Sequence, residues 1–140
     1  MKIRKILSMI CLLTLSFVLV ACGSSVDNPI PSANQGTYVS EAEKLGVKGE
    51  IRVTETTAQL IDVYAYVSSS NQVIGYALVT TSPFVFDYTI SGNTVTISAD
   101  LSGKAEDAQG NVYNITMHFS AKLNRSTNII TLGGINYIKK

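Results

Sequence analysis

From Gly36 to the end of the chain, apolar and polar residues alternate with the two-residue period of a β-strand, and Gly, Asn and Ser separate the runs. Such alternation places apolar side chains on one face of each strand. No helix-length connection separates the runs, so neighbouring strands are expected to be antiparallel. We therefore predict an all-β domain of about eight strands. The predicted strands are 36–40, 49–56, 58–67, 72–81, 84–91, 94–101, 112–123 and 128–138.

Residues 84–101 carry the strongest hairpin pattern. If Gly92 and Asn93 form a two-residue turn, Ile90 lies opposite Val95 and Tyr88 lies opposite Ile97, so that apolar residues meet apolar residues. Glycine at the first turn position supplies the positive φ of a type II′ turn. The pattern predicts this register and a buried face for the whole hairpin.

Residues 58–81 are predicted to form a second hairpin around the polar segment 68–71. The predicted pairing places Tyr64 opposite Tyr76, with Tyr66 on the same face. Tyrosines combine apolar area with a hydrogen-bonding tip, which makes this face a candidate surface for a ligand or a partner; the alternative is that the rings only cover the rim of the domain. The opposite face carries small residues that either line a cavity or pack tightly, and tight packing is expected for so small a domain.

One short segment has a helical signature. Ser40 and Glu43 have the spacing of a capping box, and Gly46 can end the turn that follows. The sequence therefore predicts one or two helical turns between Ser40 and Gly46.

A meander of eight amphipathic strands must bury one face, and closing the sheet into a barrel removes both exposed edges. The opening Gly36-Thr37-Tyr38 and the hairpin 88–97 resemble the small lipocalin-like (calycin-like) domains of bacterial lipoproteins. This resemblance implies a small antiparallel β-barrel for residues 36–140. Lipocalins open with Gly-x-Trp, where this chain has Tyr38, and they carry a closing helix that this sequence lacks. A two-sheet β-sandwich is the alternative.

The first 21 residues have the pattern of an export signal. Lys2, Arg4 and Lys5 form a positive start, and the sixteen residues from Ile6 to Ala21 carry no charge. A bilayer-spanning helix needs roughly twenty apolar residues, so this stretch is better matched to the apolar core of a signal peptide. An uncleaved anchor helix is the alternative.

The signal ends in Leu19-Val20-Ala21-Cys22, which resembles the lipobox of bacterial lipoprotein precursors. The resemblance implies that Leu19, Val20 and Ala21 are recognised by the lipoprotein signal peptidase. It also implies that Cys22 receives a diacylglyceryl group on its thiol and, after cleavage, a fatty acyl chain such as palmitate on its amino group. Such chains anchor a protein firmly, since each buried CH₂ contributes about 0.8 kcal/mol.

The residue after the lipidated cysteine influences sorting in bacteria with two membranes. Gly23 is not the Asp that typically retains lipoproteins at the inner membrane, so the resemblance favours the outer membrane or the cell surface, with a periplasmic-facing position left open. Residues 22–35 are rich in Ser and Asn and include Pro29 and Pro31, which predicts a flexible tether to the folded domain.

Little in the sequence points to catalysis or to a metal. Once the signal is removed Cys22 is the one cysteine, which excludes an intrachain disulfide and a cysteine-cluster metal site. His118, the one histidine, lies on the polar face of its predicted strand and is expected at the surface. Asp100, Glu106 and Asp107 lie near one predicted loop and are expected to be solvated, with a weak calcium site as the alternative. We therefore predict no enzyme activity, no cofactor and no bound metal.

Eight basic and ten acidic residues follow residue 21, a balance without the positive surface that nucleic-acid binding needs. We expect a lipid-anchored protein of the cell envelope that acts as a non-catalytic binding module. Its partners would be membrane lipid, through the acylated Cys22, and either a small apolar ligand inside the barrel or an envelope protein on the face of Tyr64, Tyr66 and Tyr76. The alternative is a structural or assembly component of the envelope without a small ligand.

Overall fold

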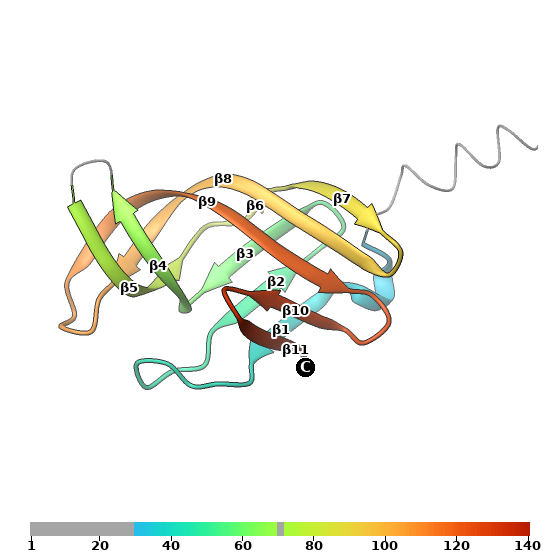
Figure 1. Ribbon diagram of the computed structural model, residues 1–140, viewed down its shortest axis with the longest axis horizontal. Coiled ribbons are helices and arrows are strands. Elements are labelled where there is room, and N and C mark those ends of the chain that lie inside the picture. Colours follow the sequence, from blue (N-terminus) through green and yellow to red (C-terminus); the bar gives the residue numbers. More distant parts are fainter. Residues whose placement is uncertain (1–29, 70–71) are drawn as a thin grey trace, which may run out of the picture.

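Eleven strands form one antiparallel sheet that curls into a half-barrel (Figure 1). The computed structural model describes residues 30–69 and 72–140; the predicted signal, Cys22 and the tether as far as Pro29 lie outside this part. The strands are β1 Gly36–Ser40, β2 Glu50–Val53, β3 Thr57–Ile61, β4 Val63–Ser69, β5 Gln72–Thr80, β6 Phe84–Val85, β7 Asp87–Ser91, β8 Thr94–Glu106, β9 Val112–Asn124, β10 Ile129–Leu132 and β11 Ile135–Lys139. The all-β, antiparallel prediction is confirmed, and a single sheet replaces the two sheets of the alternative sandwich.

The order of strands across the sheet explains why it curls. The order is β4-β5-β8-β9-β10-β11-β1-β2-β3-β6, and β7 pairs with β8 outside this path. β3 and β4 lie close to opposite ends of the order, yet Asp62 alone separates them in the chain. A flat sheet cannot satisfy both conditions, so the two ends must approach each other. Asp62 allows the change of direction by adopting a φ of +50°.

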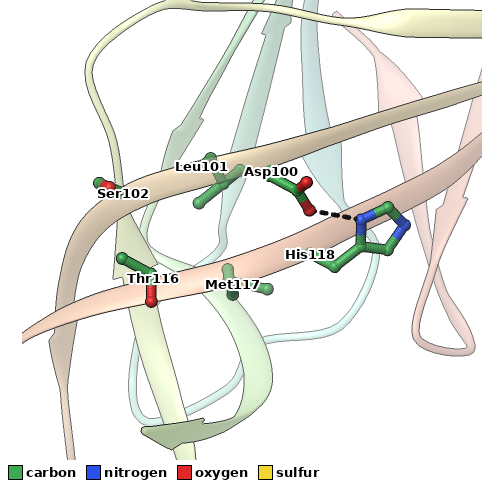
Figure 2. A pocket seen from close by; sticks show the side chains of 6 residues that line it. All are labelled: Asp100, Leu101, Ser102, Thr116, Met117 and His118. Atoms are coloured by element: carbon green, nitrogen blue, oxygen red, sulfur yellow. Dashed lines mark hydrogen bonds and ion pairs between the residues drawn. The ribbon is translucent and has the colours of Figure 1, made fainter. Parts of the chain in front are cut away.

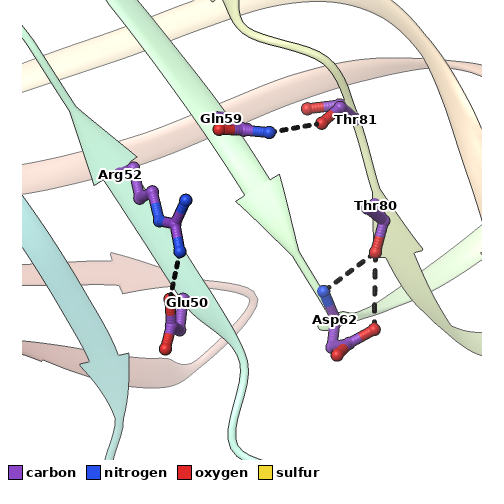
Figure 3. Close-up of polar contacts among 6 residues, drawn as sticks. All are labelled: Glu50, Arg52, Gln59, Asp62, Thr80 and Thr81. Carbon is purple, nitrogen blue, oxygen red and sulfur yellow. Dashed lines mark hydrogen bonds and ion pairs between the residues drawn. The ribbon is translucent and has the colours of Figure 1, made fainter.

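Polar contacts join β3 to the end of β5 where the two ends of the sheet approach (Figure 3). The amide of Thr81 donates to the carbonyl of Leu60 at 2.9 Å, and the Gln59 side chain donates to the carbonyl of Thr81 at 3.1 Å. The amide of Asp62 donates to Oγ1 of Thr80 at 3.1 Å. These bonds satisfy backbone groups that the strand pairing leaves unpaired.

The concave face of the sheet holds the hydrophobic core. Its largest fully buried side chains include Tyr38, Ile51, Leu60, Ile97, Phe119, Leu123, Ile130 and Tyr137. These residues come from seven strands, from β1 to β11, so the core joins distant parts of the curled sheet. Full burial of one large apolar side chain contributes about 1.5–3 kcal/mol, which makes this face the main source of stability.

The β7–β8 hairpin has the predicted register. Tyr88 lies opposite Ile97 and Ile90 lies opposite Val95, and Gly92 begins the turn with a φ of +57°. Val95 and Ile97 are buried as expected, but Tyr88 and Ile90 are exposed. The difference arises because β7 pairs with β8 alone, beside the main path of the sheet.

The β4–β5 hairpin keeps the predicted faces, but its predicted register is wrong by two residues. Tyr66, and not Tyr64, lies opposite Tyr76. The ladder extends as far as Ser69 opposite Gln72, and a β-bulge between Val67 and Ser68 changes the register. A shift of two residues returns each side chain to the same face, so the three tyrosines remain together.

β8 and β9 pair further than predicted, through the segment expected to be a loop at 102–110. The ladder reaches from Thr94 opposite Asn124 to Glu106 opposite Val112. Gly103 lies in the ladder at a point where a Cβ atom would be 2.7 Å from the carbonyl oxygen of Thr80. This glycine permits the close approach of the β5 end, and it does not break the strand.

Gly133 and Gly134 form a tight turn in the middle of the predicted strand 128–138. Their φ values are +57° and +77°, as a two-residue hairpin turn with two positive φ angles requires. The predicted strand 128–138 is therefore two antiparallel strands, β10 and β11. The reversal directs β11 back along β10 and against β1.

The helical turns predicted after Ser40 are wrong. Residues 41–49 form an irregular loop in which Lys44 and Val47 exchange backbone hydrogen bonds of 2.8 and 3.1 Å. The hydroxyl of Ser40 donates to the carbonyl of Ala42 and accepts a bond from the amide of Gly49. The side chain that was expected to cap a helix thus joins the two ends of the loop.

Residues 30–35 pack against the sheet, although the sequence placed them in the flexible tether. Ile30 is fully buried, and Ser32–Asn34 form a short 3-10 turn, η1. The side chain of Asn34 donates to the carbonyl of Arg125 at 2.8 Å and contacts Oδ1 of Asn128 at 2.7 Å. The hydroxyl of Tyr38 donates to the carbonyl of Asn34 at 2.5 Å. We call this part of the molecule, with the turns at 92–93 and 125–128, the η1 end.

Candidate functional site

The three tyrosines singled out in the sequence form one aromatic cluster on β4 and β5. The rings of Tyr64 and Tyr76 stack with centroids 5.0 Å apart, and Tyr66 meets Tyr76 edge-on at 5.3 Å. Tyr66 and Tyr76 are nevertheless 57% and 58% exposed. The contacts among the rings fix their orientation, while more than half of the surface of these two side chains remains free of protein neighbours.

A cleft of about 720 Å³ lies beside this cluster. Its walls are formed by residues 44, 64–66, 76, 117–120 and 132–135. The tyrosines form one side, and the middle of β9 and the β10–β11 turn form the other. We call it the tyrosine cleft.

The tyrosine cleft exists because β4 diverges from β2. β2 is paired with β3 as far as Glu50 opposite Ile61. After Asp62 the chain continues as β4, which within the described residues pairs with β5 only. The chain before Glu50 turns away into the loop 41–49, so no strand covers the outer edge of β4 in this part of the structure.

The cleft combines apolar and polar groups. Met117, Phe119, Leu132 and Ile135 supply apolar walls. Nζ of Lys44 lies 5.5 Å from the centroid of the Tyr64 ring, a distance at which a cation is attracted to an aromatic face. Such a lining suits a ligand with an apolar body and a polar group at one end.

The small residues on the other face of the hairpin are part of the core. Val63, Val67, Ala77 and Val79 are buried and pack with the rest of the concave face. These four residues pack tightly, as expected from the sequence, whereas Ala65 on the same face is half-buried and lines the tyrosine cleft.

His118 also reaches the tyrosine cleft, from the side of β9. Its Nδ1 lies 2.9 Å from Oδ1 of Asp100 on β8, and Figure 2 shows the two side chains at a shallow depression of about 400 Å³. The side chains of His118 and Asp100 are 66% and 92% exposed, as the alternation predicted for His118. An ion pair in such a position contributes at most about 1 kcal/mol.

Asp107 is engaged in the structure of its own turn. Its carboxylate accepts bonds of 2.9 Å from the amides of Gln109 and Asn111 and a bond from the hydroxyl of Tyr113. Burial raises the pKa of this carboxyl, but the hydrogen bonds together lower it. In residues 30–69 and 72–140 no three His, Cys, Asp or Glu side chains converge to hold a metal ion.

The sequence identified the aromatic wall of the cleft and missed the others. Lys44, Met117–Phe119 and Leu132–Ile135 come from three segments that meet only in the folded sheet. Alternation marked the apolar members as core residues, and no local pattern distinguishes a core residue from one that lines an opening.

Searches against protein-family models, curated proteins and solved structures found no match to this chain. None of the helices in the described part has the length and apolar character to cross a bilayer.

Proposed function

We propose that this chain is a lipid-anchored protein of the bacterial cell envelope and that its half-barrel is a non-catalytic binding module. The tyrosine cleft is its ligand site, and the observation that carries this proposal is the cleft's combination of size and lining. The ligand is a small molecule with an apolar body and a polar or anionic group. The module belongs with the lipocalin-like barrels that its opening residues and central hairpin resemble.

The volume of the cleft supports a small ligand. Sites for small molecules typically occupy about 300–1,000 Å³ and are lined by apolar and aromatic side chains with a few polar groups. A cleft of about 720 Å³ bounded by Tyr66, Tyr76 and Phe119 fits this description. Lys44 and His118 at its walls offer the groups that would orient a polar or anionic end of the ligand.

The exposed rings also suit a protein partner, which is the second candidate. Tyr66 and Tyr76 are more than half exposed, and aromatic residues are enriched at the centres of protein interfaces. A small ligand is preferred because the rings face a hollow bounded on its other side by β9 and β10.

The anchor rests on the pattern of residues 2–22. Cys22→Ala removes the thiol that would carry the lipid, so the variant should leave the acylated membrane fraction, and its mass should lack an acyl increment. Fractionation and intact mass spectrometry of the native protein measure both effects. A native protein with an unmodified thiol at position 22 would refute the anchor.

The ligand site is tested with a fluorescent apolar anion, anilinonaphthalene sulfonate, on residues 22–140 carrying Cys22→Ser so that no lipid competes for the probe. Tyr66→Ala and Tyr76→Ala together should weaken probe binding by about tenfold or more, because they remove one wall of the cleft. Tyr88→Ala, a tyrosine on β7 outside the cleft, is the matched control. Equal binding by all three proteins would exclude the cleft as the site. If instead only a protein partner depends on Tyr66 and Tyr76, the second candidate holds.

A further inference from the structure

Basic side chains gather at the η1 end of the molecule. Arg125 lies in the β9–β10 turn, where its guanidinium donates to the carbonyl of Gly92 at 2.6 Å. Lys139 donates from Nζ to the carbonyl of Ala33 at 2.6 Å, and the amide of Lys140 donates to the carbonyl of Thr37. Lys122 lies on β9 close to the same turn. All four side chains are exposed at least in part.

Acidic residues are distributed differently. The end away from η1 holds the loop 41–49, β4, β5 and the β8–β9 turn (Figure 1). There the described acidic residues Glu41, Glu43, Glu50, Asp62, Glu106 and Asp107 outnumber the basic residues Lys44, Lys48 and Lys104. In the half that contains η1, the described acidic residues are Glu55 in the turn after β2 and Asp87 at the start of β7. Charge is therefore distributed unevenly along the long axis of the described part of the chain, with an excess of positive charge toward η1.

The same end is the one from which the chain leaves toward its proposed lipid anchor. Eight residue steps separate Cys22 from Ile30. A chain of that length spans at most about 29 Å even when fully extended. Ile30 is fully buried at the η1 end, so an acylated Cys22 keeps this end within about 29 Å of the lipid.

We propose that the η1 end is a membrane-facing surface and that Lys122, Arg125, Lys139 and Lys140 contact anionic phospholipid headgroups. This inference rests on the proposed lipid anchor. Basic residues within a Debye length, about 8–10 Å, of an anionic leaflet are attracted to it, and each favours contact about fivefold. The lipid anchor holds the protein near the membrane, and the basic residues determine which end of the domain faces the lipid. β4 and β5, which carry the tyrosines of the cleft, lie at the other end of the sheet (Figure 1), so the tyrosine cleft then faces away from the bilayer.

The test uses the lipidated protein, purified from membranes and reconstituted into vesicles. Cleavage of the signal leaves Cys22 as the one native cysteine, and acylation blocks its thiol, so an introduced cysteine is labelled uniquely. Thr127→Cys marks the η1 end and Ala108→Cys marks the β8–β9 turn; both positions are exposed. Quenching of a fluorophore on each cysteine by a headgroup-attached quencher reports how close each end lies to the membrane.

In phosphatidylcholine vesicles that contain phosphatidylglycerol, we expect the label at Thr127 to be quenched several-fold more strongly than the label at Ala108. Lys122→Glu with Lys140→Glu should shift the orientation equilibrium away from contact by at least about 25-fold, the effect expected from two residues. Lys48→Glu with Lys104→Glu, the same charge change at exposed positions elsewhere, should leave the quenching unchanged. The preference should also disappear in vesicles of phosphatidylcholine alone.

Equal quenching of the two labels in a vesicle-bound protein would overturn the inference, and so would a preference that the Lys122 and Lys140 substitutions do not change. If Cys22 carries no lipid, the experiment gives a different result. In that case the protein lacks an acyl mass and does not sediment with phosphatidylcholine vesicles, before any orientation is measured.

Discussion

Both ends of the half-barrel are built from strands with alternating apolar and polar residues, but the η1 end is covered by other segments and the cleft end is exposed. At the η1 end, Ile30 and Tyr38 are completely buried, and Asn34 joins three segments by hydrogen bonds. At the cleft end, Tyr66 and Tyr76 are more than half exposed, and β4 has one strand neighbour among the described residues. The difference depends on whether another segment of the chain covers the open part of the sheet.

This contrast suggests how stability and binding are divided. The chain's own residues 30–35 fill the η1 end, so substitutions there should act on folding. No described segment covers β4 in this way, so the aromatic side chains there remain exposed and can contact a ligand or a partner. Substitutions there should act on binding and leave stability nearly unchanged.

The largest effect on stability is expected from Ile30→Ala. Removing a fully buried isoleucine leaves a cavity and should lower the free energy of unfolding by about 2–5 kcal/mol. Urea denaturation followed by circular dichroism measures the change. The control is Ile90→Ala on β7, where the side chain is 42% exposed and a cost below about 1 kcal/mol is expected. Equal costs at the two positions would show that residues 30–35 are not part of the folding unit.

Alkaline pH should weaken the fold through two buried phenols. Burial raises the pKa of Tyr38 and of Tyr137 to about 12, from an ordinary value of 10.0. Both rings stay neutral in the folded state while the unfolded chain ionises, so their stabilising contribution is complete below pH 10 and is lost between pH 10 and about 12. The urea midpoint should therefore be lower at pH 11 than at pH 8. Tyr137→Phe should remove about half of that difference; an unchanged difference would mean that other groups cause it.

A smaller effect is expected at the turn that borders the cleft. Gly134 has a φ of +77° and open space where a Cβ atom would lie, so Gly134→Ala adds backbone strain without a clash. The cost should be about 1–2 kcal/mol, measured by thermal unfolding. Gly134→Asn should cost less, because asparagine adopts positive φ more readily. If both variants cost the same, the turn does not require this conformation.

The smallest effect on stability belongs to Tyr66→Ala. Most of this side chain is exposed, so the free energy of unfolding should change by no more than about 0.5 kcal/mol, while probe binding in the tyrosine cleft is reduced. Tyr66→Phe keeps the ring and separates the role of the hydroxyl from that of the apolar area. A large loss of stability in Tyr66→Ala would contradict the division between the two ends.

Local patterns predicted local structure well. The β7–β8 hairpin has its predicted register because a two-residue turn at Gly92-Asn93 and five residue pairs determine it together. The three tyrosines share a face because side-chain alternation has a period of two and survives a register shift of two.

Features that depend on contacts between distant segments could not be predicted. Gly103 and Gly133 look alike in sequence, but one lies in a strand beside Thr80 and the other reverses the chain. Ser40 and Glu43 have the spacing of a helix cap, yet the hydroxyl of Ser40 bonds to the loop and to Gly49. The burial of Ile30 and the far wall of the tyrosine cleft likewise arise only when remote strands meet.

The position of β1 between β2 and β11 has a consequence for how the chain is made. The first and last strands are hydrogen-bonded neighbours, with Tyr38 opposite Lys139 and Ser40 opposite Tyr137. During synthesis β11 emerges long after β1, so a nascent chain lacks one hydrogen-bonded neighbour of β1 until β11 has been made. Pairing between such remote segments forms slowly, because a long loop must close first. The sheet should therefore remain incomplete at β1 throughout most of translation, and its final pairing should be a late step of folding.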